Sequence, residues 1–386
     1  MKRDAFTEQM PGRLVVNLQG GLTFAPSPLP PAGLSFSMPL LRQIGVVDNM
    51  LGRLEGTAKG LPDRRILIRS FVRREAQLSS YIENTYARYE DIAVADEEGR
   101  GEVAEPVRET LNAERAINAG INAVFDQGRP VTLQLIRQMH GVLLTGVRGH
   151  GSRGKFRQMQ VYIGSSHEVE HARFVPPPEH MLDELMDSFA AYLPDAGDLP
   201  AAVRLALLHY QFETIHPFED GNGRLGRILI LLGLCQYKLL SVPLFNASLH
   251  FERNRQEYYD RLLKVSTHGD WIGWIGFFVE GLRVAAVESL AKLDELTTLR
   301  ADYHHRLQSA RNSSLLLKLV DLLFIRPVIR VSDAADEMRV TYPPAQKSIQ
   351  KLVKARILTE AKPRSMPARF VARGILKAVN AEPTRR

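Results

Sequence analysis

The chain has 386 residues and a formal net charge of +7, from 50 Lys and Arg against 43 Asp and Glu. Hydrophobic residues make up 45% and charged residues 24%, which are ordinary globular values, so a wholly disordered or collagen-like chain is excluded. The single cysteine, Cys235, excludes a disulfide framework and a cysteine-based zinc site, and it suits a reducing compartment.

The start of the chain has charges but no apolar stretch behind them, so it does not resemble a signal peptide. The most apolar run, residues 228–235, is far too short to span a membrane. We therefore expect a soluble, cytoplasmic protein without a membrane partner.

The first half of the chain alternates between proline-rich, helical and β-prone segments. Residues 11–39 hold six prolines and predict an extended arm, either wrapped on a surface or loosely ordered. Helical spacing follows over 63–89 and 108–145, with an acidic loop at 96–106 between them. The β-prone runs 160–164 and 172–175, which three prolines follow, predict a hairpin. Helical pattern then dominates from 179 to about 311, with breaks at 194–200, 216–223 and 241–247.

The tail differs from the rest in charge. Residues 311–386 hold 16 Lys and Arg against 6 Asp and Glu, so they carry +10 and the other 310 residues sum to −3. Their pattern is helix (315–324), short helix (332–338), helix (344–355) and two β-prone runs (357–359 and 368–371), which suits a winged helix-turn-helix. Lys347, Lys351 and Lys354 recur at helical spacing, as on a helix that contacts nucleic-acid phosphates. Winged helices also dock proteins, so both partners remain open.

The most informative stretch, His216 to Arg227, joins two predicted helices and reads HPFEDGNGRLGR. Glycines at the start of a helix let backbone N–H groups face a ligand, and the helix dipole adds positive charge, so this loop predicts an anion site. Arg224 and Arg227 share one helix face and suit a polyphosphate. Asp220 is an oxygen ligand suited to Mg²⁺, and His216 is a candidate proton acceptor.

The alternative is a polar loop whose His and Asp only cap helix ends. For any one of these residues that alternative would be favoured. For the whole group it is not, because His, Asp, Gly-Asn-Gly and two Arg fall within twelve positions.

These residues resemble the signature of the Fic family, H-[PF]-x-x-[DE]-G-N-G-R-x-x-R, at every position. The resemblance covers roughly residues 110–285. It implies a mainly helical fold and, for most members, transfer of AMP from ATP to a Ser, Thr or Tyr hydroxyl of a target protein. It further implies His216 as general base, Asp220 as Mg²⁺ ligand and Phe218 as an anchor in the core. The ATP-binding residues it implies are Gly221, Asn222, Gly223, Arg224, Leu225, Gly226 and Arg227.

Two flanking segments extend the resemblance. Residues 155–157 followed by Gln160, Val161, Tyr162, Ile163 and Gly164 resemble the family's flap, a hairpin that holds the target segment by strand addition. Tyr258 and Tyr259 resemble the segment that lines the adenine pocket, although paired tyrosines on a helix are more often core residues.

An upstream motif resembles the family's inhibitory sequence, [ST]-x-x-x-E-[GN], through Ser79, Glu83 and Asn84. Ser79 and Glu83 are four residues apart and share a helix face. The resemblance implies that Glu83 pairs with Arg227 and so removes the arginine that would hold the γ-phosphate. The alternative is that Glu83 is one of many solvated glutamates on a charged helix and has no inhibitory role. In some relatives this glutamate also positions water for removal of AMP.

Three other features of the sequence say less about function. Residues 149–156 nearly match the sequence of a phosphate-binding P-loop, but Phe156 occupies the position at which that motif requires Ser or Thr. Gly223 stands where a phosphate-transferring branch of the family has Lys, which favours AMP transfer. His209, His304 and His305 lack the neighbours of a metal site, and we expect structural or surface roles.

We therefore predict a mainly α fold, a Fic-type helical core with a β-hairpin flap and a C-terminal winged helix-turn-helix. The expected divisions are 1–107 (arm and inhibitory motif), 108–285 (catalytic core), 286–311 (linker helix) and 312–386 (winged helix). The predicted function is a protein adenylyltransferase held down by Glu83, with self-modification and AMP removal left open. The alternative is a DNA-binding transcriptional regulator with a nucleotide-sensing core. ATP, Mg²⁺, a target protein and a second copy of the chain are the expected partners.

Overall fold

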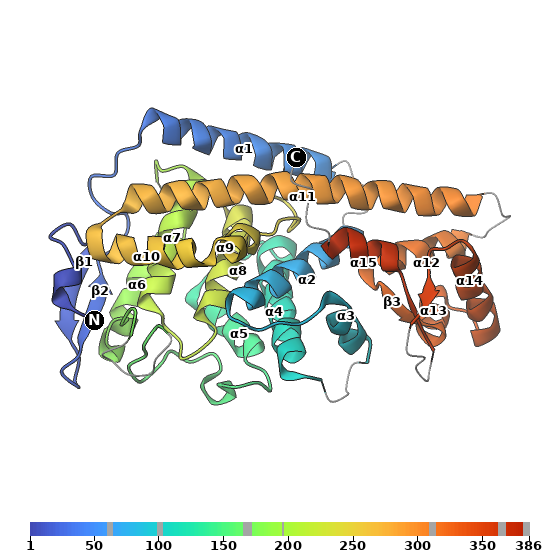
Figure 1. Ribbon diagram of the computed structural model, residues 1–386, viewed down its shortest axis with the longest axis horizontal. Helices are drawn as coiled ribbons and strands as arrows, with labels where there is room; N and C mark the ends of the chain where they lie inside the picture. Colours follow the sequence, from blue (N-terminus) through green and yellow to red (C-terminus); the bar gives the residue numbers. More distant parts are fainter. Residues whose placement is uncertain are drawn as a thin grey trace.

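The computed structural model describes residues 1–59, 65–98, 103–164, 172–194, 197–308, 314–361 and 368–380. These residues form a mainly helical molecule, which confirms the predicted fold class (Figure 1). The elements before the motif loop are η1 (Arg3–Ala5), β1 (Gly12–Val16), β2 (Leu22–Pro26), α1 (Met38–Lys59), α2 (Arg65–Ile82), α3 (Tyr89–Glu98), α4 (Glu105–Ile121), η2 (Asn122–Asp126), α5 (Leu133–Leu143), η3 (His150–Ser152), η5 (Glu179–Met181), α6 (Leu182–Tyr192) and α7 (Ala201–Ile215). The elements after it are α8 (Asn222–Gln236), α9 (Ser248–Arg253), α10 (Arg255–His268), α11 (Trp271–Gln308), α12 (Ser314–Ile325), β3 (Val328–Arg330), α13 (Val331–Met338), α14 (Tyr342–Lys354), β4 (Thr359–Glu360), β5 (Arg369–Val371) and α15 (Arg373–Asn380).

Helices α7 and α8 form the centre of the molecule. Both are apolar around most of their circumference, and nearly every residue of each is buried. A helix that is hydrophobic all round must be enclosed by other elements. Helices α2, α4 and α5 pack against α8, and α6, α10, α11 and β2 pack against α7. The loop that joins α7 to α8 therefore begins and ends on rigid, buried supports.

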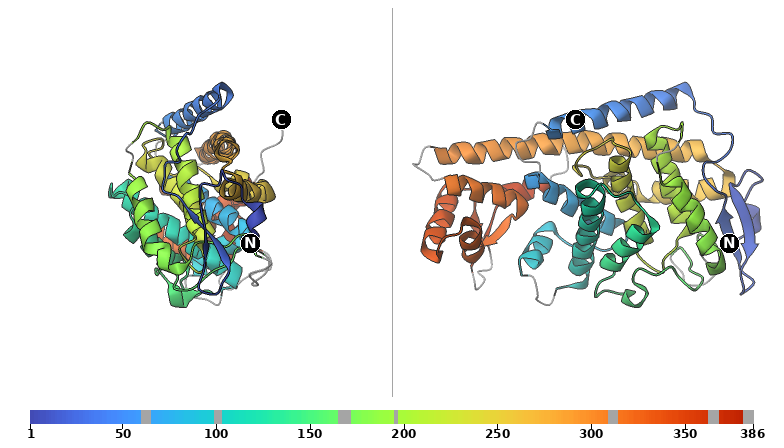
Figure 2. Two further views of the ribbon diagram at one scale, coloured as in Figure 1. Left: turned by 90° about the vertical axis from the view of Figure 1, so that its left-hand side faces the viewer. Right: turned by 180° about the vertical axis from the view of Figure 1, so that it is seen from behind.

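The long helix α11 spans the molecule and joins its two ends. Helix α1 lies along it, as Figures 1 and 2 show. The buried residues of α1 recur every three or four positions and form the stripe that faces its neighbours: Leu40, Ile44, Val47, Leu51, Leu54 and Ala58. The predicted division at residue 285 falls inside α11, because no proline interrupts the helical pattern there. None of the helices in the described ranges is long and apolar enough to cross a membrane.

The N-terminal arm is more ordered than its prolines predicted. Residues 12–26 form an antiparallel hairpin in which Gly12 pairs with Pro26 and Val16 with Leu22. The Asn17 side-chain oxygen accepts the backbone N–H groups of Gln19 and Gly21 and closes the turn. Of the two predicted states, extended chain on a surface is confirmed, because β2 packs on α7, and a loosely ordered arm is not. The pairing of the two strands into a hairpin was not predicted, and the asparagine turn explains it.

The tail forms one unit that rests on α2. Strands β3, β5 and β4 make an antiparallel sheet in that order, and α13 packs against α14. The predicted helices and β-prone runs of the tail match α12, α13, α14, β4 and β5, whereas β3 and α15 were not predicted. Helix α12 packs on α2, where the Ser70 hydroxyl donates a 3.0 Å hydrogen bond to the Phe324 carbonyl. The unit thus contacts the helix whose far end carries Ser79.

Candidate active site

The loop from His216 to Gly221 is held in shape by its own residues. His216 ends α7 in the left-handed conformation, with φ 51°, and Gly221 begins α8 with φ 81°. Phe218 is fully buried, as the sequence predicted for an anchor. The Asn222 side chain closes the loop by accepting the Phe218 N–H at 2.9 Å and donating to the Phe218 carbonyl at 2.8 Å. The loop is therefore prearranged rather than mobile around a ligand.

The His216 ring is oriented by its own helix. Its Nδ1 lies 3.2 Å from the Glu213 carbonyl, and since a carbonyl only accepts, Nδ1 carries the proton. The other nitrogen, Nε2, is then the unprotonated one. Burial lowers the pKa of His216 to about 4, and the nearby positive charge of Arg157 lowers it too, against the Glu213 carbonyl, which raises it. At neutral pH the ring is an uncharged proton acceptor.

Arg157 fastens this loop from behind. Its guanidinium donates to the carbonyls of His216 at 2.9 Å, Met159 at 3.0 Å and Pro177 at 2.6 Å. The Arg157 N–H also donates to the Pro217 carbonyl at 2.9 Å. Sequence analysis noted Arg157 only as part of the flap segment, and the structure shows that this buried side chain also joins the flap region to the histidine loop.

His140 supports the loop from α5, and no sequence pattern marked it. The Gly154 N–H donates to its Nδ1 at 2.9 Å, so its Nε2 carries the proton and donates to the Asp220 carbonyl at 3.0 Å. Its ring stacks on Phe218, with the ring centroids 3.8 Å apart. Burial lowers the pKa of His140 to about 4, consistent with the neutral form that these bonds require.

The Asp220 carboxylate has one occupied and one more open oxygen. Its Oδ1 accepts from the Gly221 N–H at 2.6 Å and from Arg224 at 3.3 Å. Its Oδ2 lies 4.0 Å from Arg148, and the side chain is half-buried. A single outward carboxylate oxygen fits Mg²⁺, which is usually held by one or two carboxylates together with substrate phosphates and water. No group of three or more metal-ligating side chains occurs among the described residues.

Arg227 is buried and bound to the upstream motif. Its Nε donates to the Ser79 hydroxyl at 2.9 Å, and its Nη2 donates to the Ser79 carbonyl at 2.9 Å and to Glu83 Oε1 at 2.8 Å. The Glu83 carboxylate lies against Gly223, so close that a Cβ there would collide with it. An anionic group thus stands at the first turn of α8, where the helix dipole favours negative charge. Asn84, with φ 60°, accepts a hydrogen bond from Arg255.

Arg224 is bound to a carboxylate that the sequence did not single out. Its Nη1 donates to Glu109 Oε2 at 2.8 Å, and its Nη2 donates to Asp220 Oδ1 at 3.3 Å. Glu109 comes from α4 and also accepts the Thr85 hydroxyl at 3.1 Å. Both arginines of the motif are therefore paired with glutamates in this structure. A glutamate on a helix with many charges gives no sequence signal for such a role.

Comparison with known sequences identifies the family that this loop represents. The Fic/DOC family pattern matches residues 130–234, which include the whole loop and most of α8. The Fic/DOC family N-terminal pattern matches residues 41–122, which include Glu83 and Glu109. Residues 41–122 and 130–234 thus carry the two regions of the Fic/DOC family.

Curated Fic relatives match the chain over part of its length. The protein adenylyltransferase Fic of Drosophila grimshawi is 32% identical over 167 residues, 42% of this chain and 30% of that protein. A probable protein adenylyltransferase of Aquifex aeolicus is 35% identical over 101 residues, 26% of this chain and 29% of that protein. The match thus spans about 30% of the length of these relatives.

Solved Fic structures share the fold. A Fic family protein from Desulfovibrio desulfuricans has a TM-score of 0.57 at 20% identity and covers 88% of this chain and 97% of that one. Fic-1 from C. elegans has a TM-score of 0.54 at 19% identity and covers 66% of this chain and 73% of that one. At these identities the likeness concerns the fold alone.

The predicted Fic flap is a short pairing in the described residues. Ile163 and Phe174 form an antiparallel bridge, with N–O distances of 2.9 and 3.1 Å between their backbones. Residues 165–171, the expected connection, lie outside the described residues. The N-terminal hairpin abuts this region: Asn17 donates to the Gln160 side chain, and the Tyr162 hydroxyl donates to Gln19. Val161 and Gly164 complete the run, and Gly164 is exposed.

The two tyrosines predicted for the adenine pocket of this Fic chain have different surroundings. Tyr258 is only 1% exposed, and its hydroxyl donates to His209 Nε2 at 2.8 Å. It is a core residue, because α10 turns that face toward α7 and α9, and placing it on a ligand surface was wrong. Tyr259 is partly exposed and donates to the Ile82 carbonyl at 3.3 Å.

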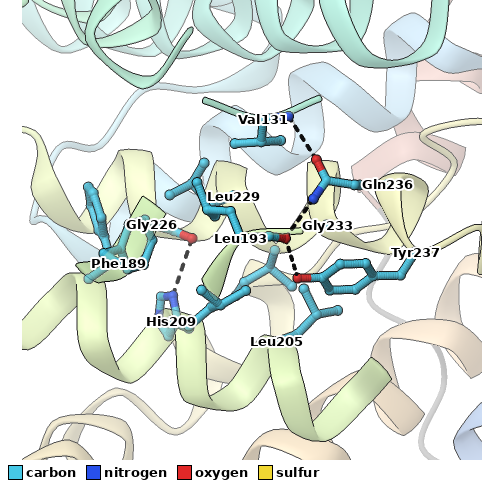
Figure 3. A pocket seen from close by; sticks show the side chains of 13 residues that line it. Val131, Phe189, Leu193, Leu205, His209, Gly226, Leu229, Gly233, Gln236 and Tyr237 are labelled. Atoms are coloured by element: carbon cyan, nitrogen blue, oxygen red, sulfur yellow. Dashed lines mark hydrogen bonds between the residues drawn. The ribbon is translucent and has the colours of Figure 1, made fainter. Parts of the chain in front are cut away.

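His209 and a small cavity lie between α7 and α8. His209 donates from Nδ1 to the Gly226 carbonyl at 3.2 Å, as Figure 3 shows. The cavity, of about 20 Å³, is lined largely by apolar side chains of α6, α7 and α8. That volume holds about one water molecule and is too small for a nucleotide. His209 therefore has the structural role predicted for it.

Proposed function

We propose that this chain is a protein adenylyltransferase that transfers AMP from ATP to a Ser, Thr or Tyr hydroxyl of a target protein. The observation that supports it best is the unprotonated Nε2 of His216 beside the N-terminus of α8. The neutral ring, the glycines of the loop and the two motif arginines converge on one end of this buried helix.

In the proposed reaction, the target hydroxyl oxygen attacks the α-phosphorus of ATP. The bond from that phosphorus to the bridging oxygen of the β-phosphate breaks, and pyrophosphate leaves. His216 Nε2 takes the hydroxyl proton, which a neutral imidazole with a lowered pKa is free to do. Arg157 holds the backbone carbonyl of His216, and the Glu213 carbonyl holds the ring through Nδ1.

The first turn of α8 is the proposed phosphate site. The backbone of Gly221, Asn222 and Gly223 opens the helix, and the anion would lie where the Glu83 carboxylate now stands. Leu225 and Gly226 are buried and contribute through the helix backbone. Asp220 would hold Mg²⁺, which would neutralise phosphate charge when bound. Tyr259 is the remaining candidate for the adenine side of the site.

We further propose that Glu83 inhibits the enzyme. Its carboxylate lies over Gly223 and bonds Arg227, so it competes with phosphate for the same positive end of α8. The contacts that support this are the three hydrogen bonds from Arg227 to Ser79 and Glu83.

The test is label transfer from ATP. Glu83→Gly protein would be incubated with a lysate and Mg²⁺, once with α-labelled and once with γ-labelled ATP. The Glu83→Gly, His216→Ala protein is the matched control, because kinases of the lysate label proteins from γ-labelled ATP in both samples. AMP transfer predicts that label above this control comes from the α-position only, with the mass increment of AMP on a Ser, Thr or Tyr. Label above the control from the γ-position instead would indicate phosphate transfer and overturn the proposal.

The alternative of a DNA-binding regulator is supported by the tail. The order α12, β3, α13, α14, β4, β5 is the order of a winged helix, and we propose that fold for the unit. The outer face of α14 exposes Tyr342, Gln346, Lys347 and Lys354. Nucleic acid is the proposed partner of this face, and it is compatible with catalysis at α8.

A further inference from the structure

Both motif arginines are held by glutamates that precede the motif in sequence. Arg227 is held by Glu83, at the end of α2, and Arg224 is held by Glu109 of α4. The Arg224 side chain is 4% exposed and the Glu109 side chain is 11% exposed, so the second pair is almost fully buried. Removing one partner of such a pair leaves an uncompensated buried charge. Arg224 is thus fixed in place rather than available to swing toward a ligand.

A single turn connects the two pairs. The backbone N–H groups of Glu83 and Thr85 both donate to the Ser80 carbonyl at 3.0 Å, and Asn84 between them is left-handed. This geometry directs Glu83 to Arg227 and the Thr85 hydroxyl to Glu109 Oε2. That oxygen is the one that accepts from Arg224. The turn therefore contacts one arginine directly and the other through Glu109.

We propose that Glu109 is a positioning residue for Arg224 and Asp220, and that Thr85 makes this pair a second latch of the inhibited state. The proposal rests on the proposed function. With its Nη1 on Glu109, Arg224 places its Nη2 on Asp220 Oδ1, and the other oxygen, Oδ2, lies 4.0 Å from Arg148. When the turn withdraws Glu83, it also withdraws the Thr85 hydroxyl, and Glu109 then accepts from Arg224 alone.

The latch is tested by Thr85→Val, which removes the hydroxyl and keeps the side-chain shape. In the otherwise natural chain we expect AMP transfer to rise by about fivefold, the factor of one hydrogen bond, and less than in Glu83→Gly. In the Glu83→Gly background the inhibitory contact with Arg227 is already lost, so we expect Thr85→Val to cause no further rise in AMP transfer. Thr57→Val is the control, because the exposed Thr57 hydroxyl bonds the Arg53 carbonyl of its own helix, α1, away from the motif loop in sequence. An unchanged rate, or equal gains in both backgrounds, would overturn the latch.

The positioning role is tested by Glu109→Gln in the Glu83→Gly background. We expect the Mg²⁺ concentration for half-maximal transfer to rise by about tenfold, as for residues that orient a metal ligand. Glu105→Gln, on an exposed position of the same helix, should leave it unchanged. A Glu109→Gln protein with the melting temperature of its parent and the same Mg²⁺ dependence would overturn this role.

Failure of the proposed function is distinguishable from failure of this inference. If Glu83→Gly shows no transfer at all, the proposed activity fails. Titration of ATP·Mg²⁺ binding by calorimetry then still reports on Glu109 and Thr85. Thr85→Val should tighten that binding by about fivefold. Glu109→Gln should raise the Mg²⁺ concentration needed for half-maximal binding by about tenfold. Binding that is identical in both variants and their parent would overturn the inference independently of catalysis.

Discussion

The sequence singles out two sets of polar residues, one in the loop at the start of α8 and one on the outer face of α14. The two sets differ in burial. In the loop region the arginines are buried and each bonds defined partners, and His216 is oriented by a backbone carbonyl. On α14, Lys347 and Lys354 are exposed. The first region is prearranged, whereas the second presents charge to solvent.

This difference predicts two kinds of response to mutation. Polar groups fixed in a buried site act strongly and depend on one another, because the low local dielectric magnifies each contact. Exposed lysines contribute small, roughly equal increments that salt screens. Substitutions in the loop should therefore change rates by large factors, and substitutions on α14 should change the salt dependence of binding.

The largest effect is expected for His216→Ala in the Glu83→Gly background. Loss of a general base lowers a rate by about 10²–10⁴-fold. In the proposed site the backbone of α8, and not this ring, would hold the phosphates. ATP binding, measured by calorimetry, should stay within about a factor of two, well below one hydrogen bond. Undiminished transfer in this variant would show that His216 is not the general base. A substitution in the loop would then affect the rate no more than one on α14.

A gain of activity is expected for Glu83→Gly alone. Freeing Arg227 and the space over Gly223 should raise AMP transfer by about 5- to 150-fold, the usual range of coupling between sites. The effect should depend on the arginine, so Glu83→Gly with Arg227→Ala should show no gain over the natural chain. Steady-state label transfer gives both rates. If Glu83→Gly leaves the rate unchanged, the carboxylate has only a structural contact with Arg227.

The resemblance to the Fic family, not local pattern, implied the burial of Phe218 and the pairing of Glu83 with Arg227, which are 144 residues apart. Helical spacing alone indicated the mainly helical fold and the shared face of Ser79 and Glu83. The contacts of Glu109 with Arg224 and of His140 with Asp220 join segments about a hundred residues apart, and one Glu or His on a helix does not specify its distant partner. Tyr258 was misplaced for a related reason, since helical spacing does not say which face packs inward.

The pH dependence of transfer distinguishes a histidine with a lowered pKa from a solvated one. Because the pKa of His216 is lowered to about 4, the ring stays neutral as pH falls from 8 to 5 and is protonated only near pH 4. The acidic limb of kcat/KM for Glu83→Gly should therefore lie near pH 4, well below the value of about 6.5 for a solvated histidine. An acidic limb near pH 6.5 would show that the ring is solvated in the working enzyme.

The smallest effects are expected for the lysines of α14. If nucleic acid binds this face, Lys347, Lys351 and Lys354 neutralise phosphates, and the logarithm of affinity should fall linearly with the logarithm of salt concentration. Each Lys→Ala change should flatten that slope by about 0.9 unit, the share of one phosphate contact. The full chain would be titrated with labelled duplex DNA at several salt concentrations, with Lys318→Ala as the control, because Lys318 is exposed on α12 in the same unit.

Equal slopes for all variants, or no binding at low salt, would exclude nucleic acid at this face. The unit would then be a protein-docking or self-association module, and its contact with α2 would place that partner next to the helix that carries Ser79.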